Sequence, residues 1–295
     1  MRLLKALILM CVVLIAGCAR EKSQDVREKS QKSQVQSLDG KLITLDLSGV
    51  LLKMIKVKAG RFQMGSPDGE LGGIVNGGRR LEKTHWVTLT QDYWLGETEV
   101  TQGQWKAVIG DNPSIFKKGY DNPVENVSWD DAMEFCSKLN RQFKEKLPEG
   151  YEFSLPTEAQ WEYACRAGTT TALNNGKDLT SEDDECANLD EVGWYDENSG
   201  GPTHPVAQKK PNAWGFYDMH GNVWEWCSDR YDERYGCNNS DVTDPQGPSS
   251  GSRHVYRGGS WHGNARCCRV ADRADNSPTC RTNGLGFRLA FVPVQ

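Results

Sequence analysis

Two short stretches near the C-terminus, Arg257-Gly258-Gly259-Ser260-Trp261 and Leu285-Gly286-Phe287-Arg288-Leu289, frame the most informative part of the sequence. From Gly247 to Val294 the chain has no Lys, Glu, Gln or Met, and Trp261 is the single Trp. Further scaffold residues lie between the two stretches: Cys268-Arg269-Val270-Ala271, Arg273, Pro278 and Arg281. A composition this uneven requires a cause.

The residues between the scaffold positions share a coding property. They are His262, Gly263, Arg266, Cys267, Asp272, Ala274, Asp275, Ser277, Thr279, Cys280, Thr282, Asn283 and Gly284. Each can be encoded by a codon ending in a pyrimidine, as results when an Asn codon is randomised at its two adenines. Lys, Glu, Gln, Met and Trp cannot. Since those five types make up roughly a quarter of ordinary residues, about a dozen positions without them arise by chance in a few per cent of cases. The pattern favours diversification over chance.

Motifs elsewhere in the chain resemble one family. They are Phe62-Gln63-Met64-Gly65-Ser66, Glu97-Thr98-Glu99-Val100-Thr101, Pro123-Val124, Val127-Ser128-Trp129, Leu155-Pro156-Thr157-Glu158-Ala159-Gln160-Trp161-Glu162-Tyr163-Ala164 and Gly221-Asn222-Val223-Trp224-Glu225-Trp226. With the C-terminal scaffold they resemble the formylglycine-generating-enzyme-like (sulfatase-modifying-factor) variant of the C-type lectin fold, from about Val57 to Phe291. The resemblance implies an α+β, loop-rich, single domain over residues 41–295.

Within that family, alternating scaffold and pyrimidine-codon residues on a lipoprotein resemble the variable proteins of diversity-generating retroelements, of the treponemal variable lipoprotein type. This implies a non-catalytic binding protein with a variable region at about 254–291. Trp261 and the pyrimidine-codon residues would form one exposed patch for an unknown protein or glycan ligand on another cell or host. Two alternatives stay open: a family enzyme with unidentified chemistry, and an envelope accessory protein.

The resemblance allows the copper-binding positions of formylglycine-generating enzymes to be compared with this sequence. These enzymes bind copper through two cysteines located three and eight residues after the Ser of the Gly-Gly-Ser segment. Here those positions are Gly263 and Cys268. A cuprous site on a single thiolate is implausible, and Cys267 on an extended segment would point to the opposite face from Cys268. We therefore predict no copper and no oxidase activity.

Calcium is the cofactor that the resemblance favours. In family members the segment around Gly-Asn-Val/Ala-Trp-Glu wraps a calcium ion, which implies ligands from the carboxylates of Asp218 and Glu225 and the carbonyls of Gly221 and Val223. Closely spaced hard oxygens on an irregular turn suit calcium. The alternative is that the two acids accept hydrogen bonds from backbone N–H groups in turns.

The N-terminus carries export signals. After Arg2 and Lys5, the apolar run from Ala6 to Ala16 is too short to span a bilayer and is typical of a secretory signal peptide, residues 1–17. Leu14-Ile15-Ala16-Gly17-Cys18 resembles a bacterial lipobox, which predicts lipidation of Cys18 and anchoring in a membrane, since each buried methylene contributes roughly 0.8 kcal/mol. By analogy with lipoprotein sorting, Ala19 favours the outer membrane and cell surface. An incidental Cys after a plain signal peptide is the alternative.

Residues 18–40 are predicted to be a tether, because from Arg20 to Ser37 the chain is mostly Lys, Ser, Gln and Glu and cannot bury a core. The net charge of −5 gives no argument for nucleic-acid binding. Arginines dominate the C-terminal segment, and we expect most of them to brace loops by binding carbonyls and carboxylates. They are Arg253, Arg257, Arg266, Arg269, Arg273, Arg281 and Arg288.

Start and stop signals predict three helices: Gln102 to Ile109 after Thr101, Asp130 to Phe143 after Ser128, and Glu158 to Arg166 after Thr157. Short apolar runs predict strands, at Met54–Lys58, Trp86–Leu89, Tyr93–Leu95, Val255–Arg257 and Gly286–Phe291.

Aromatic and sulfur side chains complete the expected core. We expect Trp161, Trp224 and Trp226 to be buried and Trp261 to lie at the mouth of the variable surface. Cys136 with Cys165, or Cys227 with Cys268, could form a disulfide, or all four could be buried thiols.

Overall fold

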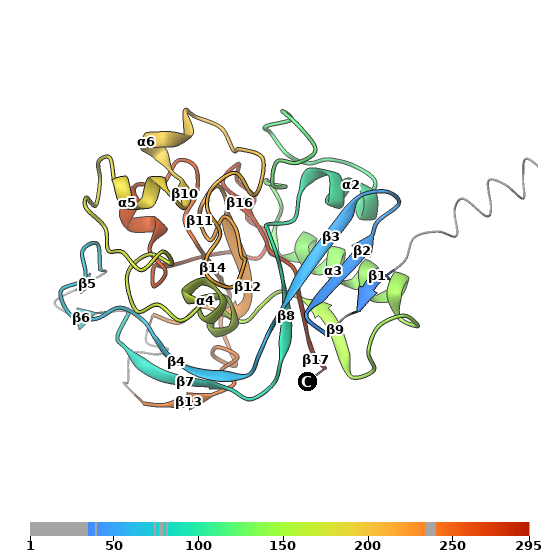
Figure 1. The fold of residues 1–295 in the computed structure, drawn as a ribbon, viewed down its shortest axis with the longest axis horizontal. Coiled ribbons are helices and arrows are strands. Elements are labelled where there is room, and N and C mark those ends of the chain that lie inside the picture. Colours follow the sequence, from blue (N-terminus) through green and yellow to red (C-terminus); the bar gives the residue numbers. More distant parts are fainter. Residues whose placement is uncertain are drawn as a thin grey trace, which may run out of the picture.

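The last strand of the chain lies inside the largest sheet (Figure 1). The computed structural model describes residues 35–38, 40–73, 75–76, 79–80, 82–233 and 240–294. In the largest sheet, β17 (Ala290–Pro293) is antiparallel to both β8 (Tyr93–Gly96) and β9 (Tyr151–Ser154). The sheet continues outward from β8 through β3 (Leu51–Val57), β2 (Leu42–Asp46) and β1 (Val35–Leu38). The C-terminal segment is therefore fixed at its far end by the main sheet.

The remaining strands form smaller sheets around this one. One has the order β15-β14-β12-β16 and another β13-β7-β4. Their bounds are β4 Gly60–Met64, β7 His85–Leu89, β12 Trp224–Arg230, β13 Val242–Thr243, β14 His254–Arg257, β15 Arg273–Asn276 and β16 Leu285–Gly286. The two-stranded pairs are β5 Val75–Asn76 with β6 Arg79–Arg80 and β10 Gly193–Trp194 with β11 His220–Gly221. The mixture of small sheets, short helices and long connections confirms a loop-rich α+β domain.

All three predicted helices are present, and each begins with a capping box. They are α2 (Gln102–Ile109), α3 (Trp129–Phe143) and α4 (Glu158–Arg166). The side chains of Thr101, Ser128 and Thr157 each accept a hydrogen bond from the backbone N–H three residues later. Helix α3 begins one residue earlier than predicted. Short helical turns lie in the connections: α5 (Ala187–Asp190), α6 (Asp196–Ser199) and η1 (Ala265–Cys268).

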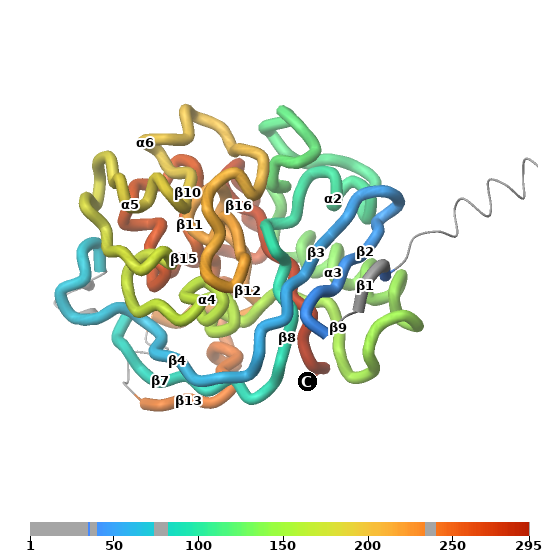
Figure 2. The backbone as a smooth tube through the Cα atoms, viewed as in Figure 1, coloured from blue at the N-terminus to red at the C-terminus, as the bar shows by residue number. Residues whose placement is uncertain are grey.

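The core has parts on both sides of β8 and β17. Helices α2 and α3 cover the main sheet, where Trp105 stacks on Phe135 and Phe287 meets both rings edge-on. Helix α4 packs beside β4, β12 and β14, with Trp161 completely buried in the second part. Figure 2 shows the last stretch of the C-terminal segment running down beside β8 and β9 to the C-terminus, and its side chains from Leu285 to Val292 belong to both parts of the core. Packing on both sides of this segment limits which of its residues can vary.

Two predicted boundaries are wrong. The predicted strand Gly286–Phe291 is two strands, β16 and β17, because between them Arg288 turns inward to bind Glu225 and the carbonyls of Gly96 and Tyr217. The predicted tether extends to residue 40, yet β1 begins at Val35 and pairs with β2. The signal peptide and Cys18 lie outside the described residues. Within the described residues, no helix is long and apolar enough to cross a membrane.

Candidate functional site: a C-terminal surface on buried arginines

Four of the five scaffold arginines of the C-terminal segment point into the protein, whereas Arg281 is exposed. Arg257, Arg269 and Arg288 are fully buried, and the side chain of Arg273 is nearly so. A buried guanidinium is tolerated only when it is paired and hydrogen-bonded. Each of these four binds a carboxylate from an earlier part of the chain. The segment is therefore tied to the rest of the domain by charge pairs.

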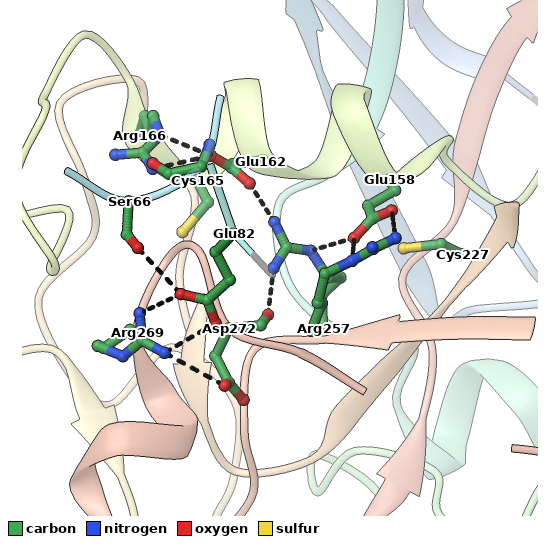
Figure 3. Close-up of polar contacts among 12 residues, drawn as sticks. Ser66, Glu82, Glu158, Glu162, Cys165, Arg166, Cys227, Arg257, Arg269 and Asp272 are labelled. Carbon is green, nitrogen blue, oxygen red and sulfur yellow. Dashed lines mark hydrogen bonds and ion pairs between the residues drawn. The ribbon is translucent and has the colours of Figure 1, made fainter. Parts of the chain in front are cut away.

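Arg269 forms the densest of these contacts (Figure 3). Its guanidinium binds both oxygens of Glu82 at 2.8 and 2.9 Å, in a bidentate arrangement. It also binds Glu70 at 2.9 Å and Asp272 at 3.3 Å. Three carboxylates therefore share one cation.

Arg257 and Arg273 bind carboxylates on helix α4. Arg257 donates to Glu162 and to the carbonyl of Asp272, and lies 3.4 Å from Glu158. Arg273 binds both oxygens of Glu158, at 2.6 and 2.8 Å. Glu158 and Glu162 are four residues apart, so both project from one face of α4. The sequence analysis did not identify these two acids as partners of the arginines. Their spacing of four residues on a predicted helix could have indicated that both face the arginine-rich segment.

The pyrimidine-codon residues lie mostly on the outside of this scaffold. His262, Arg266, Ser277, Thr279 and Thr282 are exposed. Gly263, Cys267, Ala274, Asp275, Cys280 and Asn283 are half-buried, as is Trp261. At Gly263 a Cβ atom would meet its nearest neighbours at an ordinary 3.5 Å, so a Cβ is accommodated there. Most pyrimidine-codon residues are thus more exposed than most scaffold residues.

Two residues of the predicted patch are buried, so the prediction is wrong for them. Asp272 is 6% exposed, because it pairs with Arg269 while its carbonyl accepts from Arg257. Gly284 is buried under His262, whose Cε1 would lie 2.3 Å from a Cβ at that position. Asp272 belongs to the scaffold, and a side chain at Gly284 requires His262 to move.

Trp261 is held at the centre of the exposed loops. Its indole N–H donates to the carbonyl of Asn283 at 2.9 Å, and Phe116 meets its ring edge-on at 5.2 Å. The ring of His262 is tilted against that of Trp261, at 4.6 Å between ring centroids. Of the other tryptophans, Trp161 and Trp226 are buried as predicted, whereas Trp224 is half-buried against Tyr256.

Comparison with known proteins decides the family. The sulfatase-modifying factor enzyme 1-like domain matches residues 49–292. The chain belongs to this family. It is similar to the formylglycine-generating enzyme of Mus musculus, with 32% identity over 214 residues that cover 70% of this chain. The matched region spans 53% of the mouse protein, about half of its length.

Solved structures of similar proteins cover most of the chain. Treponema denticola variable protein 1 is 35% identical, with a TM-score of 0.73 over 84% of this chain and 98% of that one. PvdO from Pseudomonas aeruginosa is 25% identical, with a TM-score of 0.66 over 81% and 94%. Relatives in the sulfatase-modifying factor family thus include named enzymes and a variable protein. Membership alone does not decide whether this chain is catalytic.

The positions of the copper cysteines in formylglycine-generating enzymes do not fit a copper site here. Gly263 has no ligand atom, and the Cys268 thiol is fully buried beside Gly259, where a Cβ would lie 2.5 Å from the sulfur. Burial raises the pKa of this thiol well above its usual range, which disfavours the thiolate that binds metals. The expected extended segment at Cys267 is the helical turn η1, and the Cys267 thiol donates to Asn264.

The two carboxylates expected to bind calcium, Asp218 and Glu225, accept hydrogen bonds from different groups of the protein. Both oxygens of Glu225 accept from Arg288, and Trp161 donates to one of them at 2.7 Å. Glu225 therefore does not fit a calcium ligand in this arrangement. Asp218 is buried, accepts from the backbone N–H of Ala207, and has one oxygen without a donor. Calcium at Asp218 and the carbonyls of Gly221 and Val223 stays a prediction.

Metal-ligand clusters and disulfides are absent from the described residues. No group of three or more His, Cys, Asp and Glu side chains there could hold a metal ion. The proposed disulfide partners Cys136, Cys165, Cys227 and Cys268 are all buried free thiols. Cys136 and Cys165 lie in separate parts of the core, which explains why their helices do not bring them together.

Burial, with a smaller contribution from neighbouring carboxylates, raises the pKa of two acids in this network. Burial raises the pKa of Asp272 to about 7, beside an Arg269 already bound to Glu70 and Glu82. Burial also raises the pKa of Asp229 to about 7, near the carboxylate of Glu158. Ordinary Asp in the unfolded chain titrates near 3.9.

We therefore expect stability to fall as pH rises through 7. A folded-state pKa above the unfolded value means that the folded state holds protons that it loses near pH 7, while the unfolded chain is already ionised. Between pH 6.5 and 8.5 the ionisation of each acid should lower the free energy of unfolding by on the order of 1 kcal/mol. Urea unfolding at the two pH values measures this. The Asp229→Asn/Asp272→Asn variant should lose most of the difference, and an equal pH dependence in that variant would assign the effect to other groups.

Proposed function

We propose that this protein is a non-catalytic, surface-displayed binding protein whose C-terminal segment is a diversified ligand-binding surface. The observation that carries the proposal is the separation by exposure described above. Four of the five scaffold arginines of the segment are buried in charge pairs, whereas most pyrimidine-codon residues are exposed or half-buried. Similarity to Treponema denticola variable protein 1 over most of both chains supports it.

The physics of such a surface is that of an antibody paratope. A rigid framework provides anchoring geometry, and small polar side chains on loops provide adaptable hydrogen bonds. Ser277, Thr279 and Thr282 are exposed side chains of this kind. Their loop is attached to the scaffold through the backbone, since the carbonyls of Pro278 and Thr282 accept from Asp130 and Asn126. Side chains can then change without loss of the loop's anchor.

Non-catalysis is part of the proposal. The misfit at Gly263 and Cys268 argues against copper-dependent oxidation of the kind expected of formylglycine-generating enzymes. The lipid anchor at Cys18 is a second part. Lipidation there would place the domain on a membrane surface, with its binding surface free to meet a ligand on another cell.

The proposal predicts that the exposed positions can be exchanged without unfolding. A variant with new pyrimidine-codon residues at His262, Arg266, Ser277, Thr279 and Thr282 should melt within a few degrees of the wild type, since surface changes usually shift stability by no more than about 0.5 kcal/mol. Differential scanning calorimetry measures this. The matched variant, Asp272→Ala, changes a pyrimidine-codon residue that is buried, and should melt clearly lower.

Binding is tested with a displayed library randomised at the same five positions. Selection on hen lysozyme should yield binders whose specificity follows those residues. If the exchanged variant does not fold, or if the library yields no binder that depends on these positions, the diversified-surface proposal fails. The genomic DNA provides a further check, because the codons should match AAY in a nearby template repeat.

A further inference from the structure

A pocket of about 370 Å³ lies between helix α4 and the small sheet β13-β7-β4. Figure 1 shows α4 above this sheet. The volume is within the range of roughly 300–1,000 Å³ that is usual for small-molecule sites. Scaffold residues Arg257, Ala271 and Arg273 form part of the wall, whereas none of the described lining residues is a pyrimidine-codon residue. The pocket is therefore separate from the diversified surface.

Most of the pocket surface is apolar. Its apolar lining residues are Met64, Ala159, Val242, Pro245 and Ala271. Such a surface favours the apolar body of a small molecule, because binding removes that body from water. A few polar groups then orient the ligand. The class of ligand depends on which charged lining residues are not already paired within the protein.

The two arginines of the pocket are already paired with carboxylates of α4. Arg257 binds Glu162 and lies 3.4 Å from Glu158. Arg273 binds both oxygens of Glu158, at 2.6 and 2.8 Å. Figure 3 shows Glu158 and Glu162 reaching from α4 toward Arg257. Because a carboxylate already compensates each guanidinium, neither favours an anionic ligand.

Asp229 differs from the other buried acids that line the pocket. It has no ion pair among the described residues, whereas Glu82, Glu158 and Glu162 each bind an arginine. Both hydrogen bonds to its carboxylate reach Oδ2, from the backbone N–H of Glu158 at 2.8 Å and the hydroxyl of Ser228 at 3.3 Å. Burial, with the nearby Glu158 carboxylate, raises the pKa of Asp229 to about 7. Oδ1 can therefore still accept a hydrogen bond from a ligand.

Lys83 also lines the pocket, toward the other end of the same stretch of α4. A Cβ at Gly65 would lie 2.6 Å from the Lys83 carbonyl, and the Gly65 N–H donates to Glu162. Asp229 instead contacts Glu158, four residues earlier on the helix, which corresponds to a rise of about 6 Å. Within the described residues no ion pair joins Lys83 to Asp229. The carboxylate of Asp229 can therefore pair with a cation that the protein does not supply.

We propose that this pocket binds a small organic amine, with the ammonium group on the carboxylate of Asp229 and the apolar body against Met64, Ala159 and Val242. The ammonium group supplies both a positive charge and a donor for Oδ1. Because the amine binds only the folded protein, it also stabilises the fold around α4. The site stays the same while the diversified surface varies, so the inference goes beyond the proposed function and does not depend on it.

The test uses the purified full-length protein and four probes in isothermal titration calorimetry at pH 8. At this pH Asp229, with a pKa of about 7, is mostly ionised, whereas an alkylammonium group with a pKa near that of Lys, about 10.4, keeps its proton. The first probe, 2-phenylethylamine, has the ammonium group and an apolar body. The second, 2-phenylethanol, lacks the charge; methylamine lacks the apolar body; and L-phenylalanine adds a carboxylate. The first should bind at least tenfold more tightly than each of the others.

Three variants test the assigned contacts. Asp229→Asn should weaken the binding of 2-phenylethylamine at least tenfold, and it keeps an acceptor for the Glu158 N–H, so its melting curve should show a folded protein. Asp241→Asn is the matched control, because this acid is 62% exposed and pairs with Arg61 outside the pocket. It should leave binding unchanged. Lys83→Gln removes a positive charge from the lining and should not weaken binding.

Several outcomes would overturn the inference. If 2-phenylethanol binds as tightly as 2-phenylethylamine, or if the amine does not bind, the charge of Asp229 has no role in recognition. Equal weakening by Asp229→Asn and Asp241→Asn would indicate general charge attraction. Tighter binding of L-phenylalanine that is lost in Lys83→Gln would assign the pocket to zwitterions. The probe comparisons in the wild type decide the question even if Asp229→Asn does not fold.

These failures leave the proposed function separately testable. Library selection on hen lysozyme depends on exposed positions of the C-terminal segment that do not line the pocket.

Discussion

Arg269→Ala is expected to destabilise the protein by about 3–5 kcal/mol, because removing one partner of a buried charge pair leaves the other charges uncompensated. Arg269 is fully buried and binds Glu82, Glu70 and Asp272. Without the guanidinium, three acids would face one another in a low-dielectric interior. Urea unfolding monitored by tryptophan fluorescence should show a lower midpoint at an unchanged slope.

Arg266→Ala is the matched control, three residues earlier in the same segment. Its side chain is 50% exposed and lies 3.5 Å from Asp183, and exposed pairs of this kind contribute about 0–1 kcal/mol. The two alanine variants should therefore differ by several kcal/mol. Equal losses would contradict the division of the segment into a buried scaffold and an exposed surface.

The division explains what sequence reasoning could and could not predict. Helices α2, α3 and α4 were predictable because Thr101, Ser128 and Thr157 form capping boxes, which depend only on residues close in sequence. The bracing role of the arginines was predictable from their number in an otherwise small-residue segment. Their partners were not, because Glu82 lies 187 residues from Arg269 in sequence. Only the fold brings such groups together.

The same limit explains the error at Asp272 and the unexpected partner of Glu225. Asp272 can be encoded by a pyrimidine-ending codon like its neighbours, yet Arg257 at the end of β14 and Arg269 directly after η1 both contact it. Glu225 stands in a motif that implies calcium, yet Arg288 reaches its carboxylate from 63 residues away. Coding and motif patterns describe what a position resembles. Whether a side chain is free to bind a ligand depends on charges that are remote in sequence.

Trp161→Ala is expected to cost about 3–5 kcal/mol, the range for removing a large buried aromatic side chain. Trp161 is completely buried and connects α4 to the C-terminal scaffold. Its ring lies under Gly258, where a Cβ would approach Cζ2 to 3.0 Å, so the first glycine of the Arg-Gly-Gly-Ser motif leaves room for the ring. Its indole N–H also donates to Glu225, which would lose a donor.

Two further variants separate packing from hydrogen bonding at this position. Trp161→Phe keeps most of the packing and removes the donor, and should cost less than alanine, about 1–3 kcal/mol. Trp86→Ala removes a tryptophan that is 42% exposed and stacked under Arg61, and should cost about 0.5–1 kcal/mol. Thermal and urea unfolding of the three variants measure the order. If Trp161→Ala lowered the free energy of unfolding no more than Trp86→Ala, the packing of Trp161 against Gly258 would not stabilise the C-terminal segment. The buried arginine pairs alone would then have to hold that segment in place.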